Sequence, residues 1–259
     1  NMTIAIIGTG NMGGAIMRGL VKSGTCLPEQ IICTAKTEAT LNRIKEYNAN
    51  IRVSQDNAAS VAEADIVVLA VKPWLIASVM EEICPILNKQ IVVSVAAGVT
   101  LHDLAVMAGK ELPIFRAIPN TAVEALCGVT FIAQHGASDE QAEQVRLLFS
   151  ALGYASVVDE SLIPAGTALA SCGIAFAMRY IRAAMEGGVE LGFRPEEAAR
   201  IVEHTVKGAA TLLLESGAHP EVEIDKVTTA GGITIKGLNA MEKAGFTAAV
   251  IEGLKASNV

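Results

Sequence analysis

Short runs of apolar, mostly β-branched residues recur through the first 160 residues, and helical patterns of apolar positions fall between most of them. The runs occupy residues 3–7, 30–34, 65–70, 90–95, 113–117 and 128–133, and residues 154–158 could form a last strand. Helical spacing marks residues 12–21 and 139–152. Strands that alternate with helices are typical of a parallel sheet with helices on both faces, so we expect an α/β fold here.

The strand signal disappears after about residue 160, and the remaining sequence is rich in Ala, Gly and Leu at helical spacing. Pro195 suits the first turn of a long helix and Gly217 its end. One apolar stripe of that helix contains Ala198, Ile201, Val202, Thr205, Val206, Ala209, Leu212 and Leu213. We therefore predict two domains, an α/β domain over residues 1–160 and an all-helical domain over residues 161–259.

Residues 166–191 are apolar over most of the circumference of the predicted helix. Such a helix must be buried on several sides, and a small bundle cannot easily cover it alone. We therefore expect the helical domain to pack against a second copy of itself. The protein is predicted to be a homodimer through this domain, and a higher oligomer is left open.

The composition is that of a compact globular protein, with 51% hydrophobic and 18% charged residues. The formal net charge of -7 argues against nucleic acid and anionic membranes as partners, since neither attracts an acidic protein. The five cysteines are scattered and the four histidines are isolated, so we expect no metal site. No apolar run reaches the roughly 18 residues of a membrane span, and the cytoplasm is the expected location.

The first apolar run leads directly into Gly8-Thr9-Gly10-Asn11-Met12-Gly13. Any tight strand-to-helix turn can carry this spacing, but here it follows an apolar strand and opens an amphipathic helix. The first glycine allows the sharp exit from the strand, the second lets a pyrophosphate approach the backbone, and the third lets the helix pack on the sheet. The helix N-terminus would hold the phosphates. This turn predicts a dinucleotide site that includes Gly8, Gly10, Asn11, Met12 and Gly13.

The end of the second apolar run indicates which dinucleotide binds. Sites that prefer NAD usually place an acidic residue about 20 residues past the glycine turn. This run ends in Cys33-Thr34-Ala35-Lys36-Thr37, with no carboxylate before Glu38. Hydroxyl groups and a lysine suit a 2′-phosphate, so Thr34 and Lys36 predict NADPH as the cofactor, with NADH possible. The alternative is a solvated loop that happens to contain a lysine.

Three further segments follow predicted strands and would meet at their carboxyl ends, where ligands bind in open α/β sheets. They are Ala70-Val71-Lys72-Pro73, Ala96-Ala97-Gly98 and Arg116-Ala117-Ile118-Pro119-Asn120-Thr121. Small residues and proline would let the nicotinamide and ribose lie against the backbone. Lys72 and Arg116 could instead be surface charges, and Asn120 could stabilise a turn. The predicted cofactor contacts are Ala70, Val71, Lys72, Pro73, Ala97, Gly98 and Asn120.

A fourth segment lies in the helical half, in the sequence Thr228-Thr229-Ala230-Gly231-Gly232-Ile233-Thr234-Ile235. Paired glycines flanked by hydroxyl groups precede a helix that we expect over residues 235–243. Backbone N–H groups at a helix N-terminus form a cradle for a small anion such as a carboxylate. The alternative is an ordinary glycine-rich loop with a threonine cap.

Together these motifs resemble the pyrroline-5-carboxylate reductase family over practically the whole chain. The glycine turn, Ala70-Val71-Lys72-Pro73, Ala96-Ala97-Gly98 and the segment that starts at Arg116 match family motifs. In the helical half the matching segments are Thr167-Ala168-Leu169, His219-Pro220 and Gly231-Gly232-Ile233-Thr234-Ile235. The resemblance implies an NAD(P)H-dependent oxidoreductase that reduces 1-pyrroline-5-carboxylate to L-proline, the last step of proline biosynthesis.

The resemblance also implies an assembly and a substrate site. The assembly is a dimer of interlocked helical domains. The family's glycine loop, here Thr229, Ala230, Gly231 and Gly232, holds the substrate carboxylate. A threonine hydroxyl near the ring nitrogen maps to Thr234, and Thr167 maps to a threonine that lines the same pocket.

The departures from the family lie in this substrate pocket. The chain has Ala170-Ser171-Cys172-Gly173-Ile174-Ala175-Phe176 where the family reads S-G-S-G-P-A-Y, and Thr229-Ala230-Gly231-Gly232 where it reads S-P-G-G. A reductase of a related cyclic imine and a catalytically weak dinucleotide-binding regulator therefore remain as alternatives. A β-hydroxyacid dehydrogenase is disfavoured, because that family supplies a catalytic lysine early in its helical domain. This chain has no lysine between Lys110 and Lys207.

Overall fold

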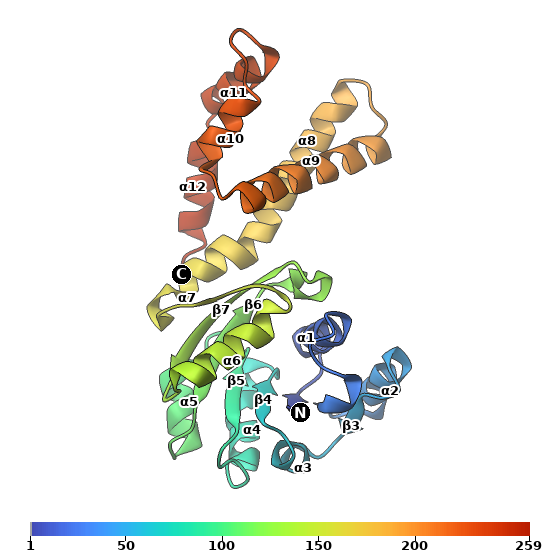
Figure 1. Cartoon of the computed structure of the whole chain (residues 1–259), viewed down its shortest axis with the longest axis vertical. Coiled ribbons are helices and arrows are strands. Elements are labelled where there is room, and N and C mark those ends of the chain that lie inside the picture. Colours follow the sequence, from blue (N-terminus) through green and yellow to red (C-terminus); the bar gives the residue numbers. More distant parts are fainter. Residues whose placement is uncertain (1) are drawn as a thin grey trace. The chain divides into compact units, whose positions relative to one another are not determined.

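The computed structural model describes residues 2–259, and Asn1, the first residue of the predicted α/β domain, lies outside them. The chain divides into two compact units, Asn1–Thr167 and Ala168–Val259 (Figure 1). This division comes later than the sequence boundary at residue 160. The reason is that the next residues pack on the first unit, where Ile163 is 2% exposed and the Glu160 carboxylate accepts a hydrogen bond of 2.8 Å from the Leu101 N–H.

An eight-stranded sheet forms the centre of the first unit, in the order β3-β2-β1-β4-β5-β6-β7-β8. Its strands are β1 (Ile4–Ile7), β2 (Ile31–Thr34), β3 (Arg52–Ser54), β4 (Ile66–Leu69), β5 (Ile91–Ser94), β6 (Ile114–Pro119), β7 (Gly128–His135) and β8 (Gly153–Val157). From β3 to β6 all neighbours are parallel. The chain order reverses at β1, which lies between β2 and β4. In such a sheet the crevice for ligands lies at that reversal, outside the carboxyl ends of the strands.

The far edge of the sheet differs from the prediction of a parallel sheet. Strand β7 is antiparallel to β6, and β8 is parallel to β7. The connection from β6 to β7 contains only the short 3₁₀ helix η3 (Thr121–Ala125), whereas a parallel connection needs a crossover of a dozen or more residues. Strand β3 was missed, because its three residues are partly exposed and carry no apolar run.

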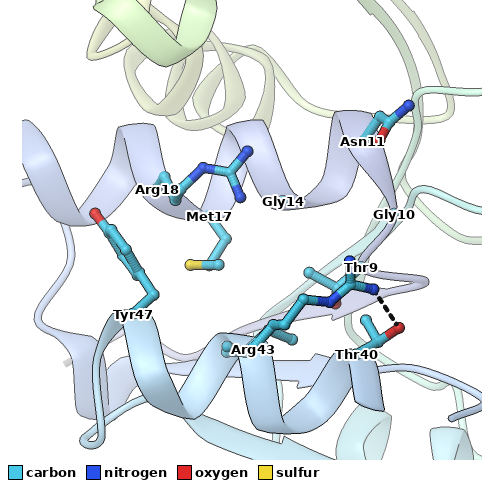
Figure 2. Close-up of a pocket in the computed structure, with 10 residues that line it drawn as sticks. Thr9, Gly10, Asn11, Gly14, Met17, Arg18, Thr40, Arg43 and Tyr47 are labelled. Carbon is cyan, nitrogen blue, oxygen red and sulfur yellow. Dashed lines mark hydrogen bonds between the residues drawn. The ribbon is translucent and has the colours of Figure 1, made fainter.

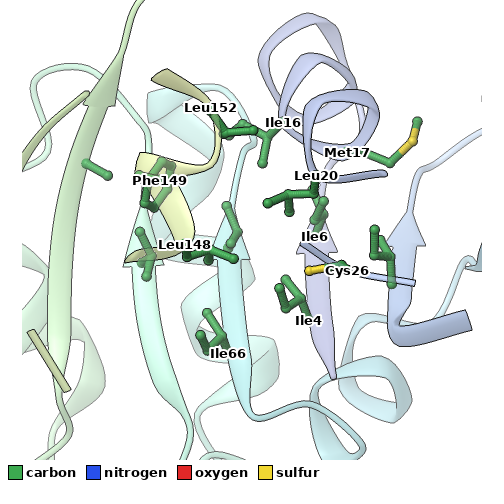
Figure 3. Packing of buried hydrophobic residues seen from close by; sticks show 14 of the residues in the cluster. Ile4, Ile6, Ile16, Met17, Leu20, Cys26, Ile66, Leu148, Phe149 and Leu152 are labelled. Atoms are coloured by element: carbon green, nitrogen blue, oxygen red, sulfur yellow. The ribbon is translucent and has the colours of Figure 1, made fainter. Parts of the chain in front are cut away.

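Both faces of the sheet are buried under helices. The helices of this unit are α1 (Asn11–Lys22), α2 (Glu38–Tyr47), α3 (Asn57–Ala62), α4 (Ile76–Ile83), α5 (Leu101–Ala108), α6 (Asp139–Ser150) and α7 (Ile163–Gly166), with the short 3₁₀ helices η1 (Pro28–Gln30), η2 (Pro73–Leu75) and η4 (Glu160–Leu162). Ile4 and Ile6 pack in one core with residues of α1 and α6 (Figure 3). Ala5 and Ile7 point into a second core under α3, α4 and α5. This alternation along β1 is the two-residue period of a strand buried on both faces.

The second unit is entirely helical. Its helices are α8 (Gly173–Glu190), α9 (Pro195–Ser216), α10 (Pro220–Lys226), α11 (Ile233–Lys243) and α12 (Phe246–Ala256), preceded by the π-helical turn η5 (Thr167–Cys172). Pro195 is the first residue of α9, and Gly217 ends it with a φ of 62°. The predicted start and stop of this helix are therefore confirmed. The fold class is confirmed as well: an α/β Rossmann-type N-terminal domain followed by an all-helical C-terminal domain.

One copy of the second unit leaves most of its apolar side chains uncovered. Helices α8 and α9 lie side by side, and the rings of Tyr180 in α8 and Phe246 in α12 meet edge to face at 6.3 Å (Figure 1). Yet Ala168 and Ala198 are the buried hydrophobic residues of this unit, whereas Leu191 and Leu214 are both 84% exposed. An apolar surface of this extent marks an interaction site.

The helical segment Glu160–Glu190 is long and apolar enough to cross a membrane, by length and composition alone. The prediction that no apolar run reaches the length of a membrane span is therefore wrong, because charged residues are few in this segment. Within this segment, 17% of the most apolar 18-residue stretch is buried in the chain. The same exposed apolar surface would be covered in an assembly of several copies.

All five cysteines are free. Burial raises the pKa of the Cys33 thiol to about 12, because the charged thiolate is poorly solvated in the core. Burial also raises the pKa of Cys26. Both therefore behave as small apolar core residues. Within residues 2–259, no group of three or more His, Cys, Asp or Glu side chains is arranged to hold a metal ion.

Candidate active site

A cleft of about 440 Å³ opens at the carboxyl ends of four neighbouring strands, β1, β2, β4 and β5. The loops after these strands supply its lining: Gly8, Thr9, Gly10, Asn11, Met12, Ala35, Lys36, Thr37, Thr40, Ala70, Val71, Lys72, Pro73, Leu75, Val95, Ala96 and Ala97. The structure thus brings together the predicted cofactor residues, apart from Gly13, Thr34, Gly98 and Asn120. The cleft spans the point where the strand order reverses, which is the ligand crevice of such sheets.

The three glycines of the turn have three different surroundings. Gly8 has a φ of +85°, and a Cβ there would lie 2.5 Å from Cγ1 of Val71. A Cβ on Gly13 would collide with the Gly8 carbonyl oxygen and lie 3.1 Å from Cβ of Ala70, so this glycine lets α1 pack on the sheet. A Cβ on Gly10 would meet nothing within 4 Å, because this residue faces the open cleft.

Helix α1 begins next to this open glycine. Gly10 is its N-cap, no side chain caps the helix, and its first turn contains no acidic residue. The N-terminal N–H groups and the positive end of the helix are therefore left for an anion. An open backbone at Gly10 beside an uncapped helix fits the pyrophosphate of a dinucleotide.

Thr34 stabilises the glycine turn through hydrogen bonds to Gly8 and Thr9. It is 2% exposed, and its hydroxyl oxygen accepts a hydrogen bond of 3.2 Å from the Gly8 N–H. Its carbonyl oxygen accepts bonds from the N–H and the hydroxyl of Thr9, at 2.9 and 3.0 Å. This role differs from the predicted contact of Thr34 with a 2′-phosphate, because the residue is buried beneath the turn and does not line the cleft.

Two lysines lie on the outer part of the cleft, and an exposed tryptophan follows the cleft residue Pro73. Lys36 and Lys72 are exposed and both line it, as predicted. The Lys36 carbonyl oxygen accepts a 2.9 Å hydrogen bond from Nε2 of Gln55, which fixes the backbone of this loop. Trp74 follows Pro73 in η2 and is 76% exposed. No signal in the sequence separated this tryptophan from a core residue.

Three residues predicted at the strand ends stabilise the fold instead of lining the cleft. Gly98 has a φ of +75° in the turn between β5 and α5. The side-chain oxygen of Asn120 accepts hydrogen bonds from the N–H groups of Ala122 and Val129, at 3.2 and 3.1 Å. This is the turn-stabilising alternative considered for Asn120. Arg116 lies within β6, and its guanidinium is 3.3 Å from the Glu160 carboxylate.

In the second unit, a tight turn over Thr229, Ala230, Gly231 and Gly232 precedes α11. The Gly232 N–H donates to the Thr229 carbonyl oxygen at 3.0 Å, and Gly231 has a φ of +71°. The helix begins at Ile233, two residues before its predicted start, because Gly232 with extended backbone is its N-cap. No side chain caps α11, and Thr234 lies exposed in its first turn. This arrangement fits a backbone cradle for a carboxylate.

Thr167 begins the π-helical turn η5, in which the chain departs from the helical hydrogen-bond pattern. Its hydroxyl donates to the Ile163 carbonyl oxygen at 2.8 Å, so its oxygen lone pairs are the part left for a ligand. The turn includes Ala170 and Cys172, where the sequence departs from the family motif. Single π-helical turns occur frequently at functional sites, and sequence patterns do not distinguish them from α-helix.

Comparison with known proteins covers the chain from end to end. A family model described as "Pyrroline-5-carboxylate reductase dimerisation" matches residues 160–259. A second, described as "NADP oxidoreductase coenzyme F420-dependent", matches residues 3–98. The chain is 40% identical to pyrroline-5-carboxylate reductase 1 of Dictyostelium discoideum over 98% of its own length and 48% of that relative. It therefore spans about half the length of this relative.

Two solved structures resemble the whole chain. A pyrroline-5-carboxylate reductase from Coxiella burnetii has a TM-score of 0.93 and 32% identity, over 99% of this chain and 96% of that one. A pyrroline carboxylate reductase from Plasmodium falciparum with NADP bound has a TM-score of 0.84 and 25% identity, over 99% and 95%.

The sheet topology, the glycine turn and the family model over residues 3–98 define the class: a Rossmann-type NADP-dependent oxidoreductase. The helical unit, with its dimerisation model and relatives, makes the assignment specific. The chain belongs to the pyrroline-5-carboxylate reductase family. The dimerisation model over residues 160–259 supports homo-oligomerisation through the helical unit.

Proposed function

We propose that this chain reduces 1-pyrroline-5-carboxylate to L-proline with NADPH as the hydride donor, which is the last step of proline biosynthesis. It is an NAD(P)H-dependent oxidoreductase that acts on a C=N bond. The observation that carries the proposal is the open glycine turn at the N-terminus of α1, in a cleft built by four strand ends. The glycine cradle before α11 supplies the matching substrate feature in the second unit.

The cofactor residues would hold the dinucleotide along the cleft. The backbone around Gly10 and the N-terminus of α1 bind the pyrophosphate, and Lys36 lies near the second strand end. Val71, Pro73 and Ala97 offer a flat wall of small and apolar groups for the ribose and nicotinamide. When bound, NADPH supplies a hydride to the imine carbon.

The substrate residues would position the imine. A cyclic imine is largely protonated near neutral pH, so the electron pair of the C=N bond passes to a nitrogen that already carries its proton. The site therefore needs position more than a strong acid. Backbone N–H groups around Gly231 and Gly232 hold the carboxylate, and the Thr234 hydroxyl orients the ring nitrogen. Thr167 is proposed to line the same pocket.

Steady-state kinetics with 1-pyrroline-5-carboxylate and NADPH test the proposal. We expect turnover to proline. NADPH binding can be measured separately by the fluorescence of Trp74, because this residue is the chain's one tryptophan and follows Pro73, which lines the cleft. A protein that binds NADPH but does not turn over this imine would overturn the proposed substrate. The fold and the cofactor class would then stand, and the altered residues 170–176 would be the place to look for a different imine.

NADPH is expected to be preferred over NADH, because no acidic residue precedes Glu38 at the end of β2 and Lys36 lines the cleft. Lys36→Glu should weaken the use of NADPH more than that of NADH, since the new carboxylate repels a 2′-phosphate. The ratio of kcat/KM for the two cofactors measures the effect. Equal values in the unmodified protein would contradict a phosphate selector at this position.

The homo-oligomer is proposed to be a cytoplasmic dimer of interlocked helical domains that binds neither nucleic acid nor membranes. Exposed residues such as Leu191, Leu214 and Ile251 would be covered by the partner subunit. Interfaces of obligate dimers bury about 2,000 Å² or more. We expect the protein to purify without detergent and to give the mass of a dimer, or of a multiple of it, in light scattering. A stable, active monomer at low micromolar concentration would contradict this assembly.

A further inference from the structure

A second, smaller cleft lies next to the cofactor cleft, between α1 and α2 (Figure 2). It is lined by Thr9, Gly10, Asn11, Gly14, Met17, Arg18, Thr40, Arg43, Ile44 and Tyr47. Thr9, Gly10, Asn11 and Thr40 line both clefts, so the two are continuous over the glycine turn. A group attached to a dinucleotide in the main cleft can therefore extend into the smaller one.

The smaller cleft contains two arginines with different partners. Nε of Arg18 lies 2.6 Å from the Glu124 carboxylate, so its positive charge is already compensated. Arg43 forms no ion pair with any residue of the part that the structure describes, residues 2–259. Figure 2 shows its guanidinium turned toward Thr9 and Thr40, in front of the glycine turn. The net positive charge of this cleft therefore comes from Arg43.

Hydroxyl groups connect Arg43 with the main cleft. Its Nη2 donates to Oγ1 of Thr40 at 3.2 Å, and that oxygen lies 3.0 Å from Oγ1 of Thr37. Thr37 is the N-cap of α2, and both threonines line the main cleft beside Lys36. A guanidinium and two hydroxyls thus lie along the first turns of α2, where the positive end of the helix adds to their attraction for an anion.

We propose that Arg43, held by Thr40, binds the 2′-phosphate of NADPH and is the main residue that selects this cofactor over NADH. A guanidinium presents several N–H donors in a rigid fork that matches a phosphate, whereas a lysine acts as a mobile point charge. Lys36 then adds charge at the rim, and Thr34 takes no part because it is buried beneath the glycine turn and lines neither cleft. This inference deepens the cofactor part of the proposed function and rests on it for the reaction alone.

Binding of 2′,5′-ADP and of 5′-AMP to the intact protein, measured by calorimetry, tests the inference without the reaction. Arg43→Ala should weaken 2′,5′-ADP binding about tenfold or more, as expected for losing a hydrogen bond between charged groups, and leave 5′-AMP binding unchanged. Arg43→Lys should fall between the parent and Arg43→Ala. Lys45→Ala is the matched control, because it removes a positive charge from the same helix, and Lys45 lines neither cleft. Thermal melting confirms that all variants fold.

If the Arg43→Ala variant binds 2′,5′-ADP with the affinity of the parent, the inference is overturned. The same holds if the variant loses as much affinity for 5′-AMP as for 2′,5′-ADP. A large loss in Lys36→Ala with none in Arg43→Ala would assign the selection to Lys36. In assays with the imine, Arg43→Ala should lower kcat/KM for NADPH and leave that for NADH unchanged. If the parent binds 2′,5′-ADP through Arg43 but does not reduce the imine, the proposed substrate fails and the assignment of Arg43 stands.

Discussion

Gly10→Val is expected to remove NADPH binding while leaving the protein folded. The φ of Gly10 is -84°, outside the left-handed region, and a Cβ there meets nothing within 4 Å, so the fold has room for a branch at this position. The same space is where a pyrophosphate must approach the backbone at the start of α1. Losing two charged hydrogen bonds of about 1.5 kcal/mol or more each corresponds to about 100-fold or more in affinity.

Gly13→Ala is the contrasting variant. Its Cβ would collide with the Gly8 carbonyl oxygen and crowd Ala70, so α1 must move away from the sheet. Overpacking of this kind costs about 1 to 3 kcal/mol of stability. Calorimetric NADPH titration and thermal melting separate the two variants: Gly10→Val should lose binding at an almost unchanged melting temperature, and Gly13→Ala should melt earlier. NADPH binding by Gly10→Val at the parent's affinity would contradict the placement of the pyrophosphate.

The parts of the fold that the sequence predicted correctly follow from local rules. Glycine adopts a positive φ at low cost, which explains the exit from β1 at Gly8 and the end of α9 at Gly217. Proline has the fixed φ of a helix and suits the first position of α9 at Pro195. The meeting of the strand-end loops followed from the parallel pairing of β1 with β2 and β4. These features needed no knowledge of distant contacts.

The parts that the sequence could not predict depend on partners far away in the chain. The Thr34 hydroxyl faces the Gly8 N–H, 26 residues earlier, and no local pattern distinguishes this bond from one to a phosphate. Asn120 likewise caps its turn through Val129. Arg43 was missed because it lies inside α2, well past the loop that follows β2, and only the packing of α2 beside α1 brings it to the glycine turn.

The helical unit shows a different limit of sequence reasoning. Residues 166–191 are apolar over most of the circumference of the helix, which correctly indicated that one copy could not bury it. In the structure, Met178 is 62% exposed. The pattern could not locate the π-helical turn at residues 167–172, because a change from i→i−4 to i→i−5 hydrogen bonding leaves no periodicity over so short a stretch. The site residue Thr167 lies at the start of that turn.

Thr234→Val is expected to lower kcat/KM for 1-pyrroline-5-carboxylate roughly 10- to 150-fold. The substitution keeps the shape of the side chain in the first turn of α11 and removes only the hydroxyl proposed to orient the ring nitrogen. A hydrogen bond to a charged partner is worth about 1.5 to 3 kcal/mol, and each ~1.4 kcal/mol is a factor of ten in rate. NADPH affinity should stay almost unchanged, because the residues that line the cofactor cleft belong to the first unit.

The matched control is Thr211→Val in α9 of the same unit. The Thr211 hydroxyl donates to the Lys207 carbonyl oxygen at 2.7 Å, so this variant also exchanges a helical threonine for valine without a proposed catalytic role. It should retain the activity of the parent. If Thr234→Val is as active as Thr211→Val, the hydroxyl has no part in the reaction, and the turn before α11 binds the carboxylate through its backbone alone. If both variants lose activity and the dimer together, the loss lies in assembly, and the comparison at matched dimer concentration isolates the contribution of the Thr234 hydroxyl.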